Sequence, residues 1–285
     1  MPRLLALSDL HVNRPHNLAA LETLADHPDD DLIVAGDVGD GPDDLARAWS
    51  RLVPRFRQLY WVPGNHELWA GPSDFLRGEA RYAALVEVCR RFGVHTPEDP
   101  PVRFEGQGGP AWVVPLFTLY DYSFRPPDVA RGSVLAWARE DGIRPVDEIR
   151  LRTDPHPDIV AWSDHLIARA EARLATVPTD APWVLVTHFP LRPDLVRLFR
   201  IPRFTPWCGT LRTSEWHRRY PVAVAVSGHL HMRATDWADG VRFEEVALGY
   251  PRHWRHEAGV EHYLRPILPG PPTPASGRGG PIWHR

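Results

Sequence analysis

The chain has 285 residues, of which 43% are hydrophobic and 24% charged, and its formal net charge is −3. All 33 basic residues are arginine, but 36 acidic residues outnumber them, which argues against the clustered basic excess that nucleic-acid binding requires. No apolar run approaches the roughly 18 to 20 residues that cross a bilayer. The length is sufficient for one large core or two modest ones, so we expect a globular protein without a membrane segment.

The two cysteines, Cys89 and Cys208, lie far apart in the sequence and form no metal-ligand spacing. Two isolated thiols fit a reducing compartment better than a disulfide scaffold. The N-terminal segment leaves no room for a signal peptide before the first candidate ligand, Asp9. We therefore expect a cytoplasmic protein.

Five short apolar runs predict buried strands, because they are too short for helices and are bounded by turn residues. The runs are Leu4–Leu7, Leu32–Ala35, Leu59–Val62, Trp183–Val186 and Val222–Val226. Helix-like stretches separate or follow them at Asn17–Ala25, Asp43–Val53, Ala80–Phe92 and Trp162–Leu174. This alternation of strands and helices predicts an α/β sandwich with buried sheets.

The other segments are less regular. Val102–Phe104 and Ala111–Phe117 predict a hairpin with a glycine-rich turn, and Val241–Leu248 predicts a closing strand. Residues 118–159 are rich in Pro, Arg, Asp and aromatic residues, which indicates an irregular insertion. Residues 269–285 are dominated by Pro, Gly and Ser, which predicts a flexible tail after a single domain over residues 1–268.

Each of the five apolar runs is followed by residues of the kind that bind metal ions. The first run precedes Asp9 and His11, the second Asp37, the third Asn65, the fourth His188, and the fifth His229 and His231. Because ligands of α/β proteins bind at the carboxyl ends of the strands, we expect these seven side chains to converge at one edge. Without metal, so many buried carboxylates and imidazoles would be costly to desolvate.

Seven ligands are too many for one ion, so the sequence predicts two ions that share one carboxylate. Asp37 is the natural bridge because it falls in the middle of the series. Oxygen and nitrogen donors without thiolate suit two divalent ions of Mn, Fe or Zn, with Mn preferred, rather than Ca²⁺. Two such ions polarise a phosphoryl group and generate a hydroxide nucleophile near neutral pH, so we expect hydrolysis of a phosphate ester.

The segments DLH, GDVGD, GNHE, THFP and GHLH, in this order from Asp9 to His231, resemble the signature of the calcineurin-like metallophosphoesterase superfamily. The resemblance covers about four-fifths of the chain. It implies a four-layer αββα sandwich of two mixed β-sheets flanked by helices, with the catalytic domain over residues 1–268. The sequence departs from the family pattern at Leu248–Trp254, where an Asn-Pro pair is expected and is absent. This departure affects the wall of the site on the substrate side, since the proposed metal ligands lie earlier in the chain.

The same resemblance implies the role of each site residue. One ion would be bound by Asp9, His11, Asp37 and His231, and the other by Asp37, Asn65, His188 and His229. His66 would protonate the leaving oxygen, with Asp40 orienting it, since an adjacent carboxylate stabilises a protonated imidazole. Three alternatives stay open: His66 is a further ligand or only fills space, Asp40 caps the next helix, and Glu67 is a surface or capping group.

The substrate class is not fixed by these motifs. We expect a small-molecule phosphate monoester or diester, without a membrane partner, and the sequence does not reveal the oligomeric state. Arg125, Arg192 and Arg252 are candidate phosphate contacts, but in a chain with so many arginines each is also an ordinary structural residue. One alternative is a nuclease, which requires Arg192–Arg219 to form a continuous basic groove. The other is a binding or scaffold protein without catalysis.

Overall fold

A computed structural model describes residues 1–284 and contains two β-sheets. The first sheet has the strand order β10-β1-β2-β3, with β1 (Leu4–Leu7), β2 (His27–Val34), β3 (Phe56–Trp61) and β10 (Arg265–Leu268). Strands β1, β2 and β3 are parallel, and β10 pairs with β1 in the antiparallel direction. The parallel strands all present their carboxyl ends at one edge of the sheet.

The second sheet has the order β11-β8-β9-β7-β6-β5-β4. Its strands are β4 (Val102–Phe104), β5 (Ala111–Pro115), β6 (Trp183–Val186), β7 (Val222–Ser227), β8 (Ala234–Ala238), β9 (Val241–Glu245) and β11 (Gly279–Trp283). The central strands β5, β6, β7 and β9 are parallel, and antiparallel strands lie on both sides of them. Both sheets are therefore mixed.

Alternation along the central strands places one row of side chains between the sheets and the other row under helices. In β1, Leu4 and Ala6 lie in the core between the sheets, whereas Leu5 and Leu7 pack toward the helices. Strand β6 does the same, since Val184 and Val186 face the first sheet and Trp183 and Leu185 pack in the outer core. Strands that are buried on both faces explain why the apolar runs are continuous.

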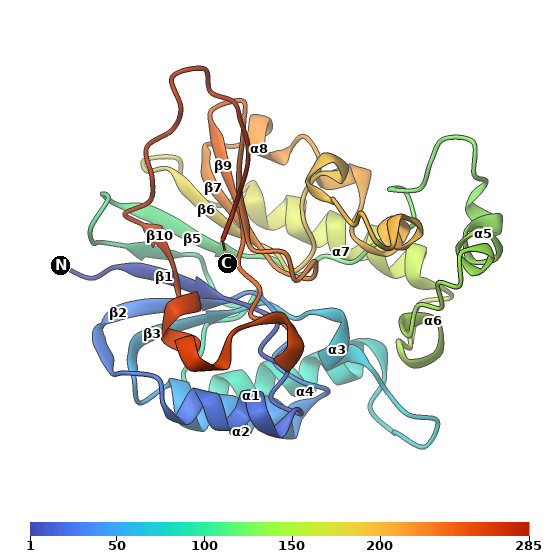
Figure 1. The fold of residues 1–285 in the computed structure, drawn as a ribbon, viewed down its shortest axis with the longest axis horizontal. Coiled ribbons are helices and arrows are strands. Elements are labelled where there is room, and N and C mark those ends of the chain that lie inside the picture. The colour runs from blue at the N-terminus through green and yellow to red at the C-terminus, as the bar shows by residue number, and fades with distance from the viewer. Residues whose placement is uncertain (285) are drawn as a thin grey trace.

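The helices form the two outer layers (Figure 1). Helices α1 (Pro15–Glu22), α2 (Pro42–Leu52) and α4 (Gly78–Arg91) cover the first sheet, and α7 (Ile159–Leu174) and α8 (Trp216–Arg219) cover the second. Helix α2 begins with Pro42 and has acidic residues in its first turn, which favours its N-terminus. Asp158 caps α7 by accepting from the Ala161 N–H at 2.8 Å. The predicted four-layer sandwich is confirmed.

Two segments differ from their description as irregular. The insertion contains α5 (Val134–Glu140) and α6 (Asp147–Arg150), and Figure 1 shows both at one end of the molecule. The proline- and glycine-rich tail, which was predicted to be flexible, instead contains strand β11, which pairs with β8 and forms one edge of the second sheet. Composition did not predict this strand, because an edge strand needs one partner rather than an apolar run. Among the described residues, no helix is both long and apolar enough to cross a membrane.

Candidate metal centre

The loops after the parallel strands carry backbone strain at the predicted ligands. Asp9, His11, Asp37, His229 and His231 all have positive φ angles, between 43° and 73°. Residues other than glycine rarely adopt this region, and such strain concentrates at functional sites. Gly36 and Gly64 allow the loops to approach, since a Cβ on either would lie within 2.5 Å of the His188 Nδ1 or the Asp37 Oδ1. The local backbone is therefore shaped to bring these side chains together.

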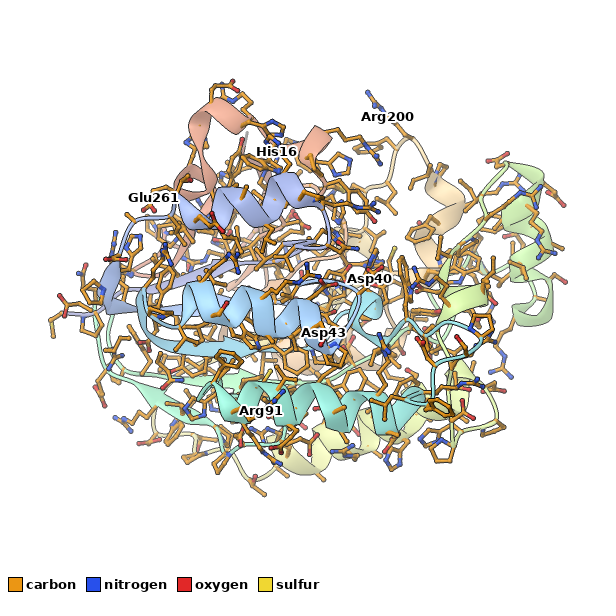
Figure 2. All side chains as sticks on the ribbon, turned by 90° about the horizontal axis from the view of Figure 1, so that it is seen from below. His16, Asp40, Asp43, Arg91, Arg200 and Glu261 are labelled. Atoms are coloured by element: carbon orange, nitrogen blue, oxygen red, sulfur yellow. The ribbon has the colours of Figure 1, made fainter. Side chains whose placement is uncertain are left out.

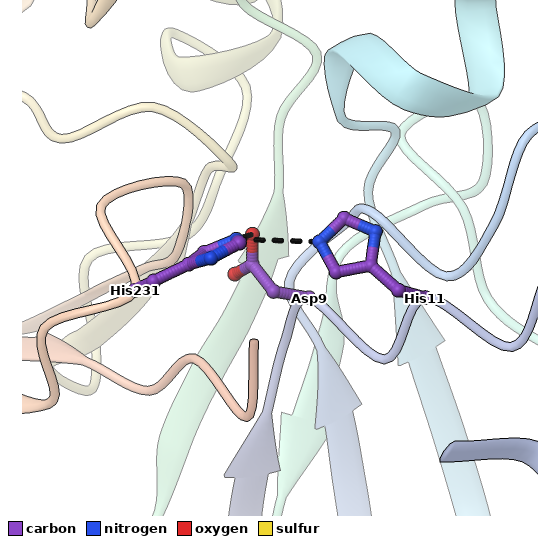
Figure 3. Close-up of side chains that lie close together, drawn as sticks. All are labelled: Asp9, His11 and His231. Carbon is purple, nitrogen blue, oxygen red and sulfur yellow. Dashed lines mark hydrogen bonds and ion pairs between the residues drawn. The ribbon is translucent and has the colours of Figure 1, made fainter. Parts of the chain in front are cut away.

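Asp9, His11 and His231 form the first group of donors (Figure 3). The Nε2 atoms of His11 and His231 are 3.2 Å apart, and the His231 Nε2 is 3.0 Å from the Asp9 Oδ1. The other oxygen of Asp9 accepts hydrogen bonds from the Ser8 hydroxyl and from the His229 N–H. One carboxylate and two imidazoles thus face a common point, which is the arrangement that a divalent cation requires.

Asp37, His188 and His229 form the second group, with their donor atoms within 4.8 Å of one another. The His188 Nδ1 is 2.8 Å from the Ala35 carbonyl, so Nδ1 carries the proton that it donates there. This tautomer leaves a lone pair on Nε2, which lies 3.5 Å from the Asp37 Oδ1. The orientation of His188 is therefore that of a metal ligand held by a backbone hydrogen bond.

Unpaired buried atoms test whether this donor set suits metal ions. The Asn65 Oδ1, the His188 Nε2 and the His229 Nε2 are buried and have no hydrogen-bond partner. Leaving such atoms unsatisfied is costly, and a cation would satisfy all of them at once. Burial lowers the pKa of His188 to about 4 and also lowers the pKa of His11 and His229. The imidazoles are therefore neutral, which is the form that binds metal.

The two carboxylates of the centre are fully buried and lie close together. Burial, followed by the negative charge of Asp9, raises the pKa of the Asp37 carboxyl well above its ordinary value. Burial also acts to raise the pKa of Asp9, but the electrostatic interaction and hydrogen bond of its carboxylate with His231 outweigh burial and hold that pKa low. Bound cations would remove the repulsion between these carboxylates. The residues present fit two divalent ions, with Asp37 between the two groups of donors.

His66 lies beside the centre, and its environment distinguishes its two ring nitrogens. Its Nδ1 is 3.1 Å from the Asp40 Oδ1, and its Nε2 is 3.8 Å from the Asp37 Oδ2. Asp40 does not cap helix α2; its backbone N–H instead donates to Asp44 at 2.8 Å. Arg150 also lies 3.4 Å from the second oxygen of Asp40. The pair is thus a histidine oriented by a carboxylate, with Nε2 directed toward the metal centre.

The described structure also contains a group of donors away from this centre. Glu79, His156 and His165 lie between α4 and α7, where the His156 Nε2 is 3.1 Å from the Glu79 Oε1. That contact is an ordinary ion pair or hydrogen bond. All nine predicted site residues, in contrast, lie on the loops at the carboxyl edge of the sheets or at the start of α3 (Asn65–Leu68).

The sequence suggested that Glu67 is a surface or capping group, but its side chain is fully buried. Its carboxylate accepts hydrogen bonds from the backbone N–H groups of Asp37, Val38 and Gly64 at 2.8 to 3.1 Å. It therefore ties the loop that carries Asp37 to the loop that carries Asn65. Burial raises the pKa of Glu67 to about 7, although the backbone donors oppose this effect.

Replacing Glu67 with glutamine is expected to lower the free energy of unfolding by about 1 to 3 kcal/mol, because the new amide N–H₂ would face backbone donors. Denaturant unfolding of the two proteins measures this difference. Glu87→Gln, at an exposed position on α4, is the matched control and should have little effect. Equal stability of the Glu67 and Glu87 variants would contradict the role assigned to Glu67.

Asp147 was missed because it lies in the irregular insertion, 82 residues from its partner Asn65. Its buried Oδ1 accepts from the Asn65 Nδ2 at 2.9 Å and from the Trp69 Nε1 at 2.6 Å. The first bond fixes the amide of Asn65 so that its Oδ1 remains free for a cation. Asp147 is therefore a positioning residue that holds the candidate ligand Asn65 in place.

Replacing Asp147 with alanine is expected to weaken metal binding by about 10- to 100-fold, because Asn65 and Trp69 lose their acceptor. Asp147→Asn keeps an acceptor oxygen and should retain most of the affinity. Competition with a metallochromic chelator measures both constants. If the alanine variant binds metal as tightly as the unsubstituted chain, Asp147 does not position Asn65.

The loop that departs from the family pattern contributes to the centre. The Tyr250 ring stacks on His11 with centroids 4.3 Å apart, and its hydroxyl is 3.3 Å from the His66 Nε2. The His253 Nδ1 is 3.0 Å from the Nδ1 of His231. Of the candidate phosphate contacts, the Arg252 guanidinium lies 5.2 Å from the centroid of the Tyr250 ring. This loop forms an aromatic and cationic wall beside the metals.

Arg125 and Arg192 have structural partners elsewhere. Arg125 donates to the carbonyls of Val129 and Tyr122, and Arg192 pairs with Asp194 and lies near Asp239. These contacts explain both arginines without a phosphate. Of the candidate arginines, Arg252 is the one that the structure places beside the centre.

Comparison with known proteins agrees with this geometry. The family model described as calcineurin-like phosphoesterase matches residues 2–233. The chain is 44% identical over 274 residues to the acyl-carrier-protein phosphodiesterase PptH of Mycobacterium tuberculosis, covering 95% of this chain and 84% of that protein. The crystal structure of the phosphopantetheinyl hydrolase PptH from the same organism matches with a TM-score of 0.89 and 44% identity, covering 95% of this chain and 97% of that chain. The chain belongs to the calcineurin-like phosphoesterase family and is a metal-dependent phosphoric ester hydrolase.

Proposed function

We propose that this chain hydrolyses the phosphodiester that links 4′-phosphopantetheine to a serine of an acyl carrier protein. The observation that carries the proposal is the 44% identity to PptH, a protein named for this substrate, over 95% of the chain. The donor set of the metal centre supports it, since such a centre suits attack on phosphorus. The domain that performs the reaction spans residues 1–268, strand β11 of the following segment extends its second sheet, and residues 118–159 form an insertion that supplies Asp147.

The proposed ligands divide between two ions, which would be manganese in the native enzyme. Asp9, His11, Asp37 and His231 would bind one, and Asp37, Asn65, His188 and His229 the other. When bound, such ions polarise the phosphoryl group and lower the pKa of water. The mixed oxygen and nitrogen donors without thiolate are compatible with Mn²⁺, as they are with Fe and Zn²⁺.

His66 supplies the proton in this proposal. Water adds to phosphorus and releases one proton to solvent, the bond between phosphorus and the serine oxygen breaks, and His66 Nε2–H protonates the departing oxygen and is later reprotonated from solvent. Asp40 accepts from Nδ1 and so keeps the ring turned with Nε2 toward the phosphate. The Tyr250 hydroxyl lies close enough to Nε2 to orient the same proton.

The nuclease alternative requires a continuous basic groove over residues 192–219. Of the seven arginines in this segment, Arg192, Arg197, Arg203, Arg212, Arg218 and Arg219 form ion pairs with acidic residues. Paired arginines give little net positive potential. The charges therefore favour a protein-bound or small diester over a nucleic acid, and the two buried free cysteines fit the proposed cytoplasmic location.

Intact-mass spectrometry of a pantetheinylated acyl carrier protein tests this proposal. With Mn²⁺, we expect loss of the phosphopantetheine group and appearance of the unmodified carrier protein. With a chelator, the carrier protein should keep its mass. If the enzyme cleaves a chromogenic diester but leaves the carrier protein intact, the assignment of this substrate is wrong.

A further inference from the structure

A surface groove of about 550 Å³ begins next to the metal centre. Its lining includes Arg197, Phe199, Arg200, Ile201, Met232 and Trp283. Met232 directly follows the proposed ligand His231. The segment from Arg197 to Ile201 continues to Phe204, whose ring lies 5.9 Å from that of His229. The groove is thus connected to the metal centre through His231 and through the contact between Phe204 and His229.

Large apolar side chains of the groove are exposed to solvent rather than packed in the core. Phe199 is 79% exposed, and Ile201 and Trp283 are each more than 40% exposed. Trp283 is in strand β11, so the C-terminal strand builds part of this surface. Exposed apolar side chains that gather beside an active site mark a surface for a partner.

The charge of the groove has one sign. Three of its lining residues are arginines, and none is acidic. Arg197 pairs with Asp236 and Arg233 donates to backbone carbonyls, but Arg200 is exposed and has no ion pair among the described residues. Figure 2 shows Arg200 projecting away from the body of the molecule. The occupant should therefore be apolar in the middle and acidic at its edge.

A second hollow on the other side of the centre provides a contrast. It contains Phe75, which is fully exposed, and it is lined by the carboxylates of Asp40, Asp43, Asp44 and Asp74 together with two arginines, Arg47 and Arg81. The carboxylates outnumber the arginines there, so this hollow is less suited to an acidic partner than the groove is. The charge therefore distinguishes two apolar surfaces beside one centre.

We propose that the groove over residues 197–201, Met232 and Trp283 binds an apolar surface with an acidic rim on the carrier protein. This inference rests on the function proposed above. In that substrate the scissile phosphate is attached directly to a serine of the carrier protein. The surface around that serine must therefore come within a side chain's length of the metals, where this groove begins. The apolar floor of the groove would receive the apolar part of that surface, and Arg200 would face the carboxylates at its rim.

The test compares two substrates of the same enzyme. Phe199→Asp and Arg200→Glu are each expected to raise KM for pantetheinylated carrier protein by about tenfold, because each places a carboxylate opposite an acidic partner. Neither residue is assigned to catalysis, so turnover of bis(p-nitrophenyl) phosphate should stay unchanged. Phe75→Asp is the matched control, and it should leave both activities unchanged.

The outcomes separate this inference from the proposed function. If the unsubstituted enzyme does not cleave the carrier protein, the proposed function fails and the groove has no such partner. If the unsubstituted enzyme cleaves the carrier protein and the two groove variants have the same KM for it as the unsubstituted enzyme, the proposed docking surface is wrong. Light scattering tests a second copy of the chain as the occupant: a dimer of the unsubstituted chain that Phe199→Asp dissociates would overturn the inference, and an unchanged oligomeric state supports it.

Discussion

Replacing Asp37 with asparagine is expected to lower kcat for any phosphate ester by about a thousandfold or more, the equivalent of about 4 kcal/mol in activation free energy. The Asp37 carboxylate is the group assigned to both ions, and the amide has the same shape but no charge. The number of metal ions bound per chain should be lower in this variant as well. Elemental analysis of the purified variant, together with hydrolysis of a chromogenic diester, measures both effects.

Asp31→Asn is the matched control for this substitution. Asp31 is likewise buried and lies in strand β2, before the loop that carries Asp37. Its partners are Arg57 and Tyr60 rather than the donors of the centre. This variant should keep its metal and its turnover. If Asp37→Asn also keeps both, the dinuclear site as assigned is wrong.

Replacing His66 with asparagine is expected to reduce kcat by about a hundredfold to ten-thousandfold for esters with an alcohol leaving group. The loss should be much smaller for a nitrophenyl ester, because nitrophenolate leaves without a proton. Metal content should stay unchanged, since His66 is assigned to proton transfer and not to binding. Turnover of the two ester types, measured beside metal content, checks all three expectations.

His165→Asn provides the control, because His165 is half exposed and lies apart from the centre. Full turnover of the alcohol ester by His66→Asn would rule out the general acid. A loss of metal in the same variant would instead support the alternative in which His66 is a further ligand.

The central strands, and the convergence of the candidate ligands, could be predicted from the sequence because both signals are local. A strand buried on both faces is a continuous apolar run, as in Trp183–Val186, and the ligand follows it within a few residues. The parallel arrangement then brings Asp9, Asp37 and His188 to one edge. Local patterns thus predict the site even though its residues span most of the chain.

The outer strands β8 and β11 of the second sheet could not be predicted in the same way. Strand β8 has the sequence ATDWA, and β11 has two glycines and a proline, so neither forms an apolar run. Each is a strand because an existing edge offers it backbone partners. The pairing is a tertiary effect, which single-strand propensity does not capture.

The supporting residues of the centre were also beyond local patterns. Asp147 reaches Asn65 from the insertion, and Tyr250 reaches His66 from 184 residues away. Glu67 adjoins the histidine in sequence, but its role depends on the backbone donors of another loop. Residues that orient ligands are recognised by geometry rather than by spacing, and the structure supplies that geometry.

The number of metal ions per chain, measured by elemental analysis during titration with Mn²⁺ and followed by diester hydrolysis, tests the central claim most directly. We predict that two ions bind, that hydrolysis rises as they bind, and that a chelator abolishes it. Hydrolysis that survives complete removal of metal, or saturation at a single ion, would contradict a centre built from Asp9, His11, Asp37, Asn65, His188, His229 and His231.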